Sequence, residues 1–116
     1  MTTSSDLQHQ HCVPCEGGTQ PLTQAEYAVY LPQVTEWQIT SDEKHLERDC
    51  SFKNFSAAIE FITTVAKIAE SEGHHPDLYL HDFKYVKVSL WTHAINGLSI
   101  NDFVLATKID ALLTAN

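Results

Sequence analysis

The sequence predicts an α+β domain of two layers, in which a four-stranded antiparallel sheet carries helices packed on one face. Two pairs of segments alternate apolar and polar residues around a short turn, which is typical of β-hairpins. Segments with apolar residues at three- and four-residue steps precede, separate and follow these pairs, as amphipathic helices do. The predicted order is therefore α-β-β-α-β-β-α, and hairpins separated by helices favour this layered arrangement.

The length of the chain and the positions of its glycine and proline residues indicate one domain with a short extension. A chain of 116 residues, 43% of them hydrophobic, can bury a single core. Residues 1–20 are polar, interrupted by glycine and proline, and without periodicity, so we expect an N-terminal extension there. The domain itself is predicted to span residues 21–116.

The first helix is predicted from its start signal. Thr23 is a suitable N-cap, and Glu26 three residues later can complete a capping box. The helix is expected to run to about Leu31, because Pro32 disfavours the helical conformation in the residue before it.

Residues 37–52 are predicted to form the first hairpin, with its turn at residues 40–43. One side of the hairpin is apolar and consists of Trp37, Ile39, Leu46, Cys50 and Phe52. Arg48 falls on this side, so we expect an edge position from which its guanidinium reaches water.

A second helix and a second hairpin follow. The helix is capped by Asn54 or Ser56 and ends at Gly73, and its apolar face is Ala58, Phe61, Ile62, Val65, Ile68 and Ala69. The hairpin turns at residues 82–84 between Leu78, Leu80 and Val86, Val88, Leu90. A last helix is predicted after Ser99, an N-cap with Asp102 three residues on, and its apolar face includes Phe103, Val104, Ile109, Leu112 and Leu113.

Three histidines are the strongest functional signal. His74 and His75 precede Pro76, which turns the pair away from the helix axis, and His93 is expected at the end of the last strand. One hairpin separates them, so the chain can return to the same rim of the sheet, where clefts form. Imidazole titrates near neutral pH, and a cluster of imidazoles indicates acid/base chemistry or metal ligation.

Simpler interpretations of these residues remain open. A single histidine at a helix C-terminus can merely stabilise the helix dipole. A zinc ion held by the three histidines with a water in the open position is another alternative, although adjacent residues such as His74 and His75 tend to project differently. The remaining histidines are expected to be surface residues: His9, His11, His45 and His81.

Charge and hydropathy exclude several classes of partner. The formal charge is −8 and the seven Lys and Arg residues are scattered, so we expect no nucleic-acid binding. No signal peptide or membrane-spanning apolar run is visible, and we expect no membrane association and a cytoplasmic location.

The cysteines are too few and too unevenly placed for a disulfide framework. Cys12 and Cys15 form a C-x-x-C motif close to His9 and His11, which could hold a soft metal or act as a redox pair. The alternative is a locally turned tail that ends at Gly17 and Gly18.

Several motifs together resemble the pterin-4a-carbinolamine dehydratase family. They are Glu70, His74-His75-Pro76-Asp77, Trp91-Thr92-His93, Asn96-Gly97-Leu98-Ser99 and Asp102. The resemblance covers the chain from about residue 21 to the end, and the predicted element order agrees with it. The Cys-Val-Pro-Cys-Glu-Gly-Gly segment is similar to an extension in some members, without a role that we can assign.

The resemblance implies a lyase that needs no cofactor or metal and that dehydrates 4a-hydroxytetrahydropterin to quinonoid dihydropterin. It implies that His74 and His93 are the acid and base and that His75 orients the pterin. It also implies that Glu70 supports the adjacent pair, His74 and His75, electrostatically. Pro76, Thr92 and Asp102 would help to bind the substrate, although Asp102 could do no more than cap its helix. The family also implies a homodimer or homotetramer.

Two departures from the family pattern concern the shape of the pocket. Gly73 stands where some members carry an acidic residue, and the second hairpin is one residue longer than in the shortest versions. A pterin- or protein-binding scaffold of the coactivator kind, or a pterin-binding protein serving another pathway, would share the same fold. The intact histidines favour catalysis over both.

Overall fold

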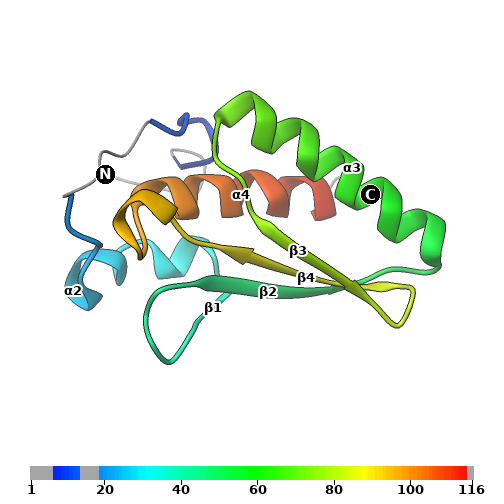
Figure 1. Cartoon of the computed structure of the whole chain (residues 1–116), viewed down its shortest axis with the longest axis horizontal. Coiled ribbons are helices and arrows are strands. Elements are labelled where there is room, and N and C mark those ends of the chain that lie inside the picture. The colour runs from blue at the N-terminus through cyan, green and yellow to red at the C-terminus, as the bar shows by residue number, and fades with distance from the viewer. Residues whose placement is uncertain (1–6, 14–18, 115–116) are drawn as a thin grey trace.

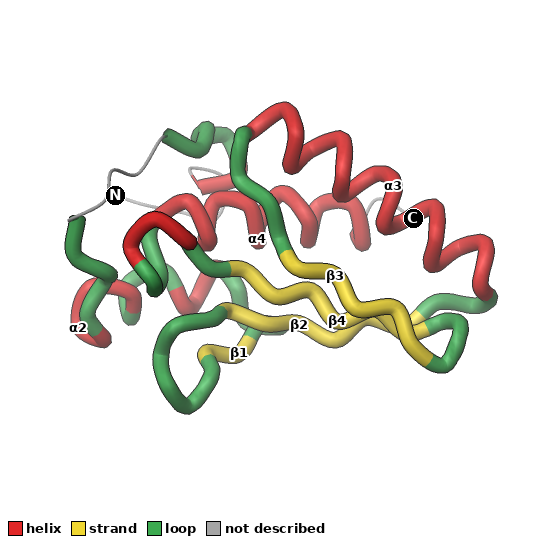
Figure 2. The backbone as a smooth tube through the Cα atoms, viewed as in Figure 1, coloured by secondary structure: helices red, strands yellow, loops and turns green. Residues whose placement is uncertain are grey.

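The computed structural model describes residues 7–13 and 19–114 and confirms the predicted α+β fold. Its four strands form one antiparallel sheet in the order β1-β2-β4-β3, and α3 and α4 lie on one face of that sheet (Figures 1 and 2). The elements, in chain order, are α2 (Gln24–Tyr27), the 3-10 helix η1 (Leu31–Gln33), β1 (Gln38–Ile39), β2 (Leu46–Ser51), α3 (Phe55–Glu72), β3 (Asp77–His81), β4 (Tyr85–Leu90), the 3-10 helix η2 (His93–Ile95) and α4 (Ile100–Thr114).

The core lies between the sheet and the two long helices. Successive strand residues point to opposite faces, so every second residue of β2 and β4 faces the helices. The buried apolar side chains of this layer are Leu46, Cys50, Val86, Val88 and Leu90 from the sheet, and Ala58, Phe61, Val65, Phe103, Val104 and Ile109 from the helices. Each large apolar side chain buried in this way contributes about 1.5–3 kcal/mol to folding.

The first helix begins as predicted and ends earlier. Glu26 N–H donates to Thr23 Oγ1 over 3.3 Å and Thr23 N–H donates to Glu26 Oε1 over 2.8 Å, which confirms the capping box. The helix stops at Tyr27, not at Leu31 as predicted. Leu31 and Pro32 instead begin a 3-10 helix, because the fixed φ of proline suits the first turn of a helix and not its interior.

Arg48 lies in the part of β2 that β1 does not reach, a local edge as predicted, but its side chain is only 20% exposed and its guanidinium binds α4. Strand β1 pairs only with Leu46 and Glu47 of β2, so it does not extend alongside Arg48. Its Nη1 contacts Asp110 Oδ1 of α4, and Trp37 Nε1–H donates to the same oxygen over 2.8 Å. Burial raises the pKa of Asp110 even though both donors lower it. This polar cluster therefore joins the sheet to α4.

Within the described part of the chain, no helix has the length and apolar character needed to cross a membrane.

Candidate active site

The end of α3 determines where His74 lies. Gly73 adopts the left-handed conformation with φ of 66°, and His74 N–H donates to the carbonyl of Ala69 over 3.2 Å. This is the Schellman ending, in which glycine avoids the steric cost that other residues meet at positive φ. It confirms the predicted helix end and directs the His74 side chain inward, where the residue is 9% exposed.

The His74 imidazole contacts a carboxylate that is fully buried. Nε2 of His74 lies 2.6 Å from Oδ1 of Asp102, in the first turn of α4. The other oxygen, Oδ2, accepts a hydrogen bond from Thr92 Oγ1 over 2.9 Å and another from Ser99 N–H over 3.0 Å. Asp102 thus caps its helix, as predicted, and also joins His74 to Thr92.

This arrangement selects one form of the His74 ring. An ionised carboxylate can only accept hydrogen bonds, so with Asp102 ionised Nε2 of His74 carries the proton and donates it to Oδ1. Nδ1 then keeps its lone pair in the neutral ring. A ring held in one tautomer with a free Nδ1 has the geometry of a group that accepts a proton.

His75 projects away from His74 and pairs with a different carboxylate. Nε2 of His75 lies 2.7 Å from Oε1 of Glu70, and the two side chains are 62% and 76% exposed. Glu70 was expected to support both histidines, but the carboxylate on His74 is Asp102. The two imidazoles reach different carboxylates because consecutive side chains of an extended chain point in opposite directions. Among the described residues, no three His, Cys, Asp or Glu side chains are grouped as a metal site would require.

His93 was expected at the end of the last strand, but it is the first residue of η2. Strand β4 stops at Leu90, and Thr92 pairs with Gly97 through a hydrogen bond from Thr92 N–H to Gly97 O over 2.8 Å. His93 is exposed, and its ring packs against Trp91 with the ring centres 4.0 Å apart.

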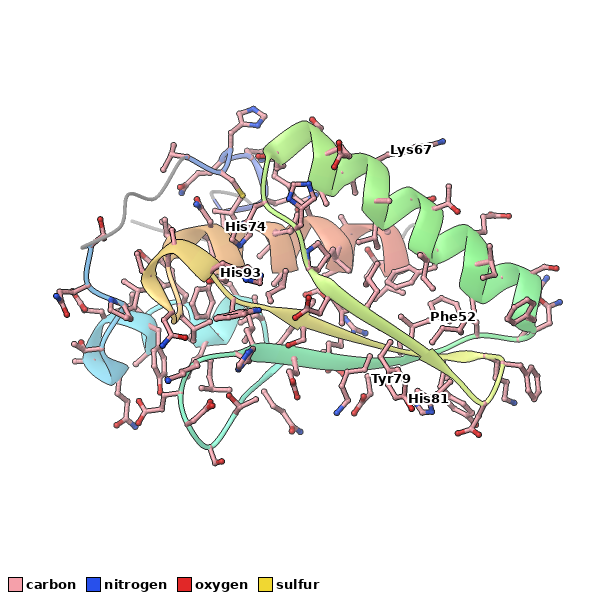
Figure 3. The ribbon with its side chains drawn as sticks, viewed as in Figure 1. Phe52, Lys67, His74, Tyr79, His81 and His93 are labelled. Atoms are coloured by element: carbon pink, nitrogen blue, oxygen red, sulfur yellow. The ribbon has the colours of Figure 1, made fainter. Side chains whose placement is uncertain are left out.

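The sheet brings these segments together at one rim. Asp77 pairs with Ser89, so the start of β3, just after His75, lies beside the end of β4. The bond between Trp91 Nε1–H and Asp77 Oδ2, at 3.3 Å, links the two segments again. Figure 3 shows His74 and His93 at the same end of the molecule, away from Tyr79 and His81.

His45 and Trp91 contribute to this rim although neither was singled out as a site residue. His45 was expected to be a surface residue, but it is half-buried, and its ring centre lies 5.0 Å from that of Trp91. Leu46 pairs with Leu90, which places the residue before β2 opposite the residue after β4. The rings of His45, Trp91 and His93 therefore form a continuous aromatic array.

Replacing Gly97 with alanine is expected to destabilise the loop that carries Thr92 and His93. A Cβ atom on Gly97 would lie 2.7 Å from Cβ of Pro21, and the neighbouring Leu22 N–H is fixed by a 2.8 Å bond to Leu98 O. Relief of this overlap requires a backbone shift, so the free energy of unfolding should fall by about 1–3 kcal/mol. Chemical denaturation measures this loss, and an unchanged midpoint would contradict the close contact.

A hollow of about 730 Å³ lies elsewhere, at the N-terminal end of α3, where Phe52, Asn54, Phe61 and Leu112 are among its lining residues. Its lining residues extend along α3 as far as Thr64, and α3 continues to Glu72, so at a rise of about 1.5 Å per residue roughly 12 Å of helix still separates the hollow from the His74 end. The hollow contains no histidine among its lining residues. The chemistry of the histidine rim makes the rim the better candidate.

The sequence model for pterin 4 alpha carbinolamine dehydratase matches residues 20–112. The chain belongs to this family. It is 45% identical over 107 residues to a protein of Alkaliphilus metalliredigens, covering 91% of this chain and 95% of the relative. It is 44% identical over 111 residues to a protein of Legionella pneumophila strain Corby, covering 95% and 97%. Both relatives are provisionally named pterin-4-alpha-carbinolamine dehydratase.

Solved structures of pterin dehydratase relatives agree with the fold. A transcriptional coactivator/pterin dehydratase from Brucella melitensis has a TM-score of 0.74 at 32% identity, over 80% of this chain and 98% of that one. A pterin dehydratase-like protein described as a RuBisCO assembly factor in the alpha-carboxysome has a TM-score of 0.56 at 20% identity, over 66% and 88%, and shares the fold alone. The resemblance read from the histidine motifs is thereby confirmed at the level of the family.

Proposed function

We propose that this member of the pterin-4a-carbinolamine dehydratase family is an active hydro-lyase. It would convert 4a-hydroxytetrahydropterin into quinonoid dihydropterin and water, a step of tetrahydrobiopterin recycling. The observation that carries the proposal is the buried chain from His74 through Asp102 to Thr92, which adjoins His93. An imidazole whose orientation and tautomer are fixed by a carboxylate is an arrangement that general acid and base groups use.

The reaction needs one acid and one base. The bond between C4a and the hydroxyl oxygen breaks, and the oxygen leaves as water only if an acid protonates it, while a base takes a proton from the pterin ring. His74 and His93 are proposed for these two roles, because they occupy different environments on the same rim. Each proton transfer contributes about 10²–10⁴-fold to the rate. Neither step requires a metal or a cofactor.

The remaining residues are proposed to bind or orient the pterin. His75 and Glu70 are exposed and can contact a ligand directly, and Pro76 fixes the chain between them and β3. Thr92 and Asp102 were expected to bind substrate, but they are 4% and 0% exposed. Their burial favours a role exerted through His74 over direct contact with the pterin.

The proposal is tested with freshly generated 4a-hydroxytetrahydropterin and protein that has been treated exhaustively with a chelator. We expect the absorbance change of dehydration to be accelerated in proportion to protein concentration, without added metal. Acceleration only after zinc is restored would favour the zinc alternative. No acceleration under either condition would contradict the proposal and favour a binding or scaffolding protein.

Assembly and location stay predictions that accompany this function. Strand β3 is at the edge of the sheet, and an unpaired edge favours association with a second copy. We expect a homodimer or homotetramer located in the cytoplasm, which size-exclusion chromatography with light scattering and cell fractionation would test.

A further inference from the structure

Residues 7–13, here called the N-terminal strap, lie against α3 and α4 (Figure 1). The strap lies outside the 20–112 span that matches the family. Leu7 is completely buried in the core, and Lys108 Nζ of α4 donates to the carbonyl of Gln8 over 2.7 Å. The predicted division between an extension at 1–20 and a domain at 21–116 stays a prediction, but the strap is packed on the domain.

Glu72, the last residue of α3, binds the strap from one side. Its Oε1 accepts a hydrogen bond from Cys12 N–H over 2.7 Å, and its Oε2 lies 3.0 Å from Nδ1 of His11 and 3.8 Å from Nζ of Lys108. The Glu72 side chain is only 6% exposed. Burial alone would raise the pKa of Glu72, but the hydrogen bonds from Cys12 and His11 and the charge of Lys108 outweigh it and lower the pKa.

Asn101, in the first turn of α4, binds the strap from the other side. Its Oδ1 accepts from Val13 N–H over 3.0 Å, and its Nδ2–H donates to Val13 O over 2.5 Å. The Cys12 thiol also lies 3.6 Å from the carbonyl of Asn101. Burial, with the charges of Glu72 and Asp102, raises the pKa of Cys12 to about 12, so this thiol is a neutral donor. That property does not favour the redox or metal interpretation of Cys12; Cys15 lies outside the described residues.

The two residues that hold the strap adjoin the two partners of the central hydrogen bond. Glu72 is separated from His74 only by Gly73, and Asn101 directly precedes Asp102. His74 and Asp102 themselves are joined by a 2.6 Å contact between two different elements. The strap therefore bridges the end of α3 and the start of α4. The distance between these two helix ends sets the geometry of the contact between His74 and Asp102.

We infer that Glu72 and Asn101 are positioning residues, which act through the strap to hold His74 and Asp102 at hydrogen-bonding distance. The expected loss of rate rests on the proposed dehydratase function, whereas the effect on the contact between His74 and Asp102 does not. Misplacement of a catalytic group by about 1 Å can cost about 100-fold in rate. The strap thus makes a segment outside the 20–112 span of the family model part of the support of the site.

Two variants test the inference from opposite sides. Glu72→Ala removes the acceptor for Cys12 N–H, and Val13→Pro removes the N–H that donates to Asn101 while leaving both helices unaltered. Each is expected to lower kcat about tenfold or more with KM changed less than twofold. Glu72→Gln keeps an acceptor for Cys12 N–H and should recover part of the loss. Glu60→Ala, an exposed glutamate of the same helix, is the matched control.

The deciding measurement is the NMR spectrum of the His74 ring, which does not depend on activity. The ¹⁵N shifts of Nδ1 and Nε2 report the tautomer and the bond to Asp102. We expect both Glu72→Ala and Val13→Pro to change these shifts, and Glu60→Ala to leave them as in the wild type. Unchanged shifts in both strap variants would overturn the inference. If wild-type protein showed no dehydration, the proposed function would fail while this spectral test would still stand.

Discussion

Asp102→Asn is expected to lower the rate of dehydration by about 10²–10⁴-fold, the range that acid/base catalysis contributes. The Asn side chain has one acceptor oxygen where Asp102 has two. That oxygen can keep the bonds from Thr92 and Ser99, and the amide NH₂ group then faces His74 Nε2. Two donors cannot bond to each other, so the His74 ring must change tautomer or rotate. In either case the carboxylate that fixes the ring and its tautomer is lost.

The measurement is the dehydration rate across pH 5–9 (roughly the range in which imidazoles titrate), together with circular dichroism to verify the fold. Asp82→Asn is the matched control, because Asp82 Oδ2 lies 2.9 Å from Nδ1 of His81 in a similar but exposed pair. The control is expected to behave as the wild type. A folded Asp102→Asn variant with a rate within twofold of the wild type would show that the carboxylate has no part in catalysis.

The fold could be predicted from the sequence because its signals are local. The Thr23 capping box, the Asn54 N-cap and the left-handed Gly73 each involve residues within one helical turn, and all three are confirmed. The early end of the first helix was missed because Pro32 can begin a new 3-10 turn as well as end a helix. Local chemistry thus determined the main helices and strands, and the two short 3-10 helices are what it left unpredicted.

The candidate site could be predicted only in part, because its contacts join distant segments. His74 and Asp102 are 28 positions apart, and no periodicity states how α4 sits against the end of α3. Asp102 was therefore expected to bind substrate or to cap its helix, and Glu70 to support both His74 and His75. His45 was missed for a related reason. The pairing of β2 with β4 places it beside Trp91, and these two strands are separated in the sequence by the whole of α3.

His74 and His93 should both be required for dehydration but should differ in chemical rescue. His74→Ala and His93→Ala are each expected to lower the rate by about 10²–10⁴-fold. His93 is exposed, and its described ring contact is with Trp91, so free imidazole can enter the space left by its removal. His74 is 9% exposed and lies against the buried Asp102, so free imidazole should not replace it.

The test compares the two alanine variants with and without added imidazole, at a pH near the pKa of imidazole in solution. Recovery of the rate in His93→Ala alone is the expected result, because only the exposed position leaves a path for a small base. Recovery in both variants would mean that His74 is more accessible than its burial indicates. Wild-type rates in both variants, without imidazole, would remove the acid/base assignment altogether, because the two imidazoles are the groups proposed to move the protons.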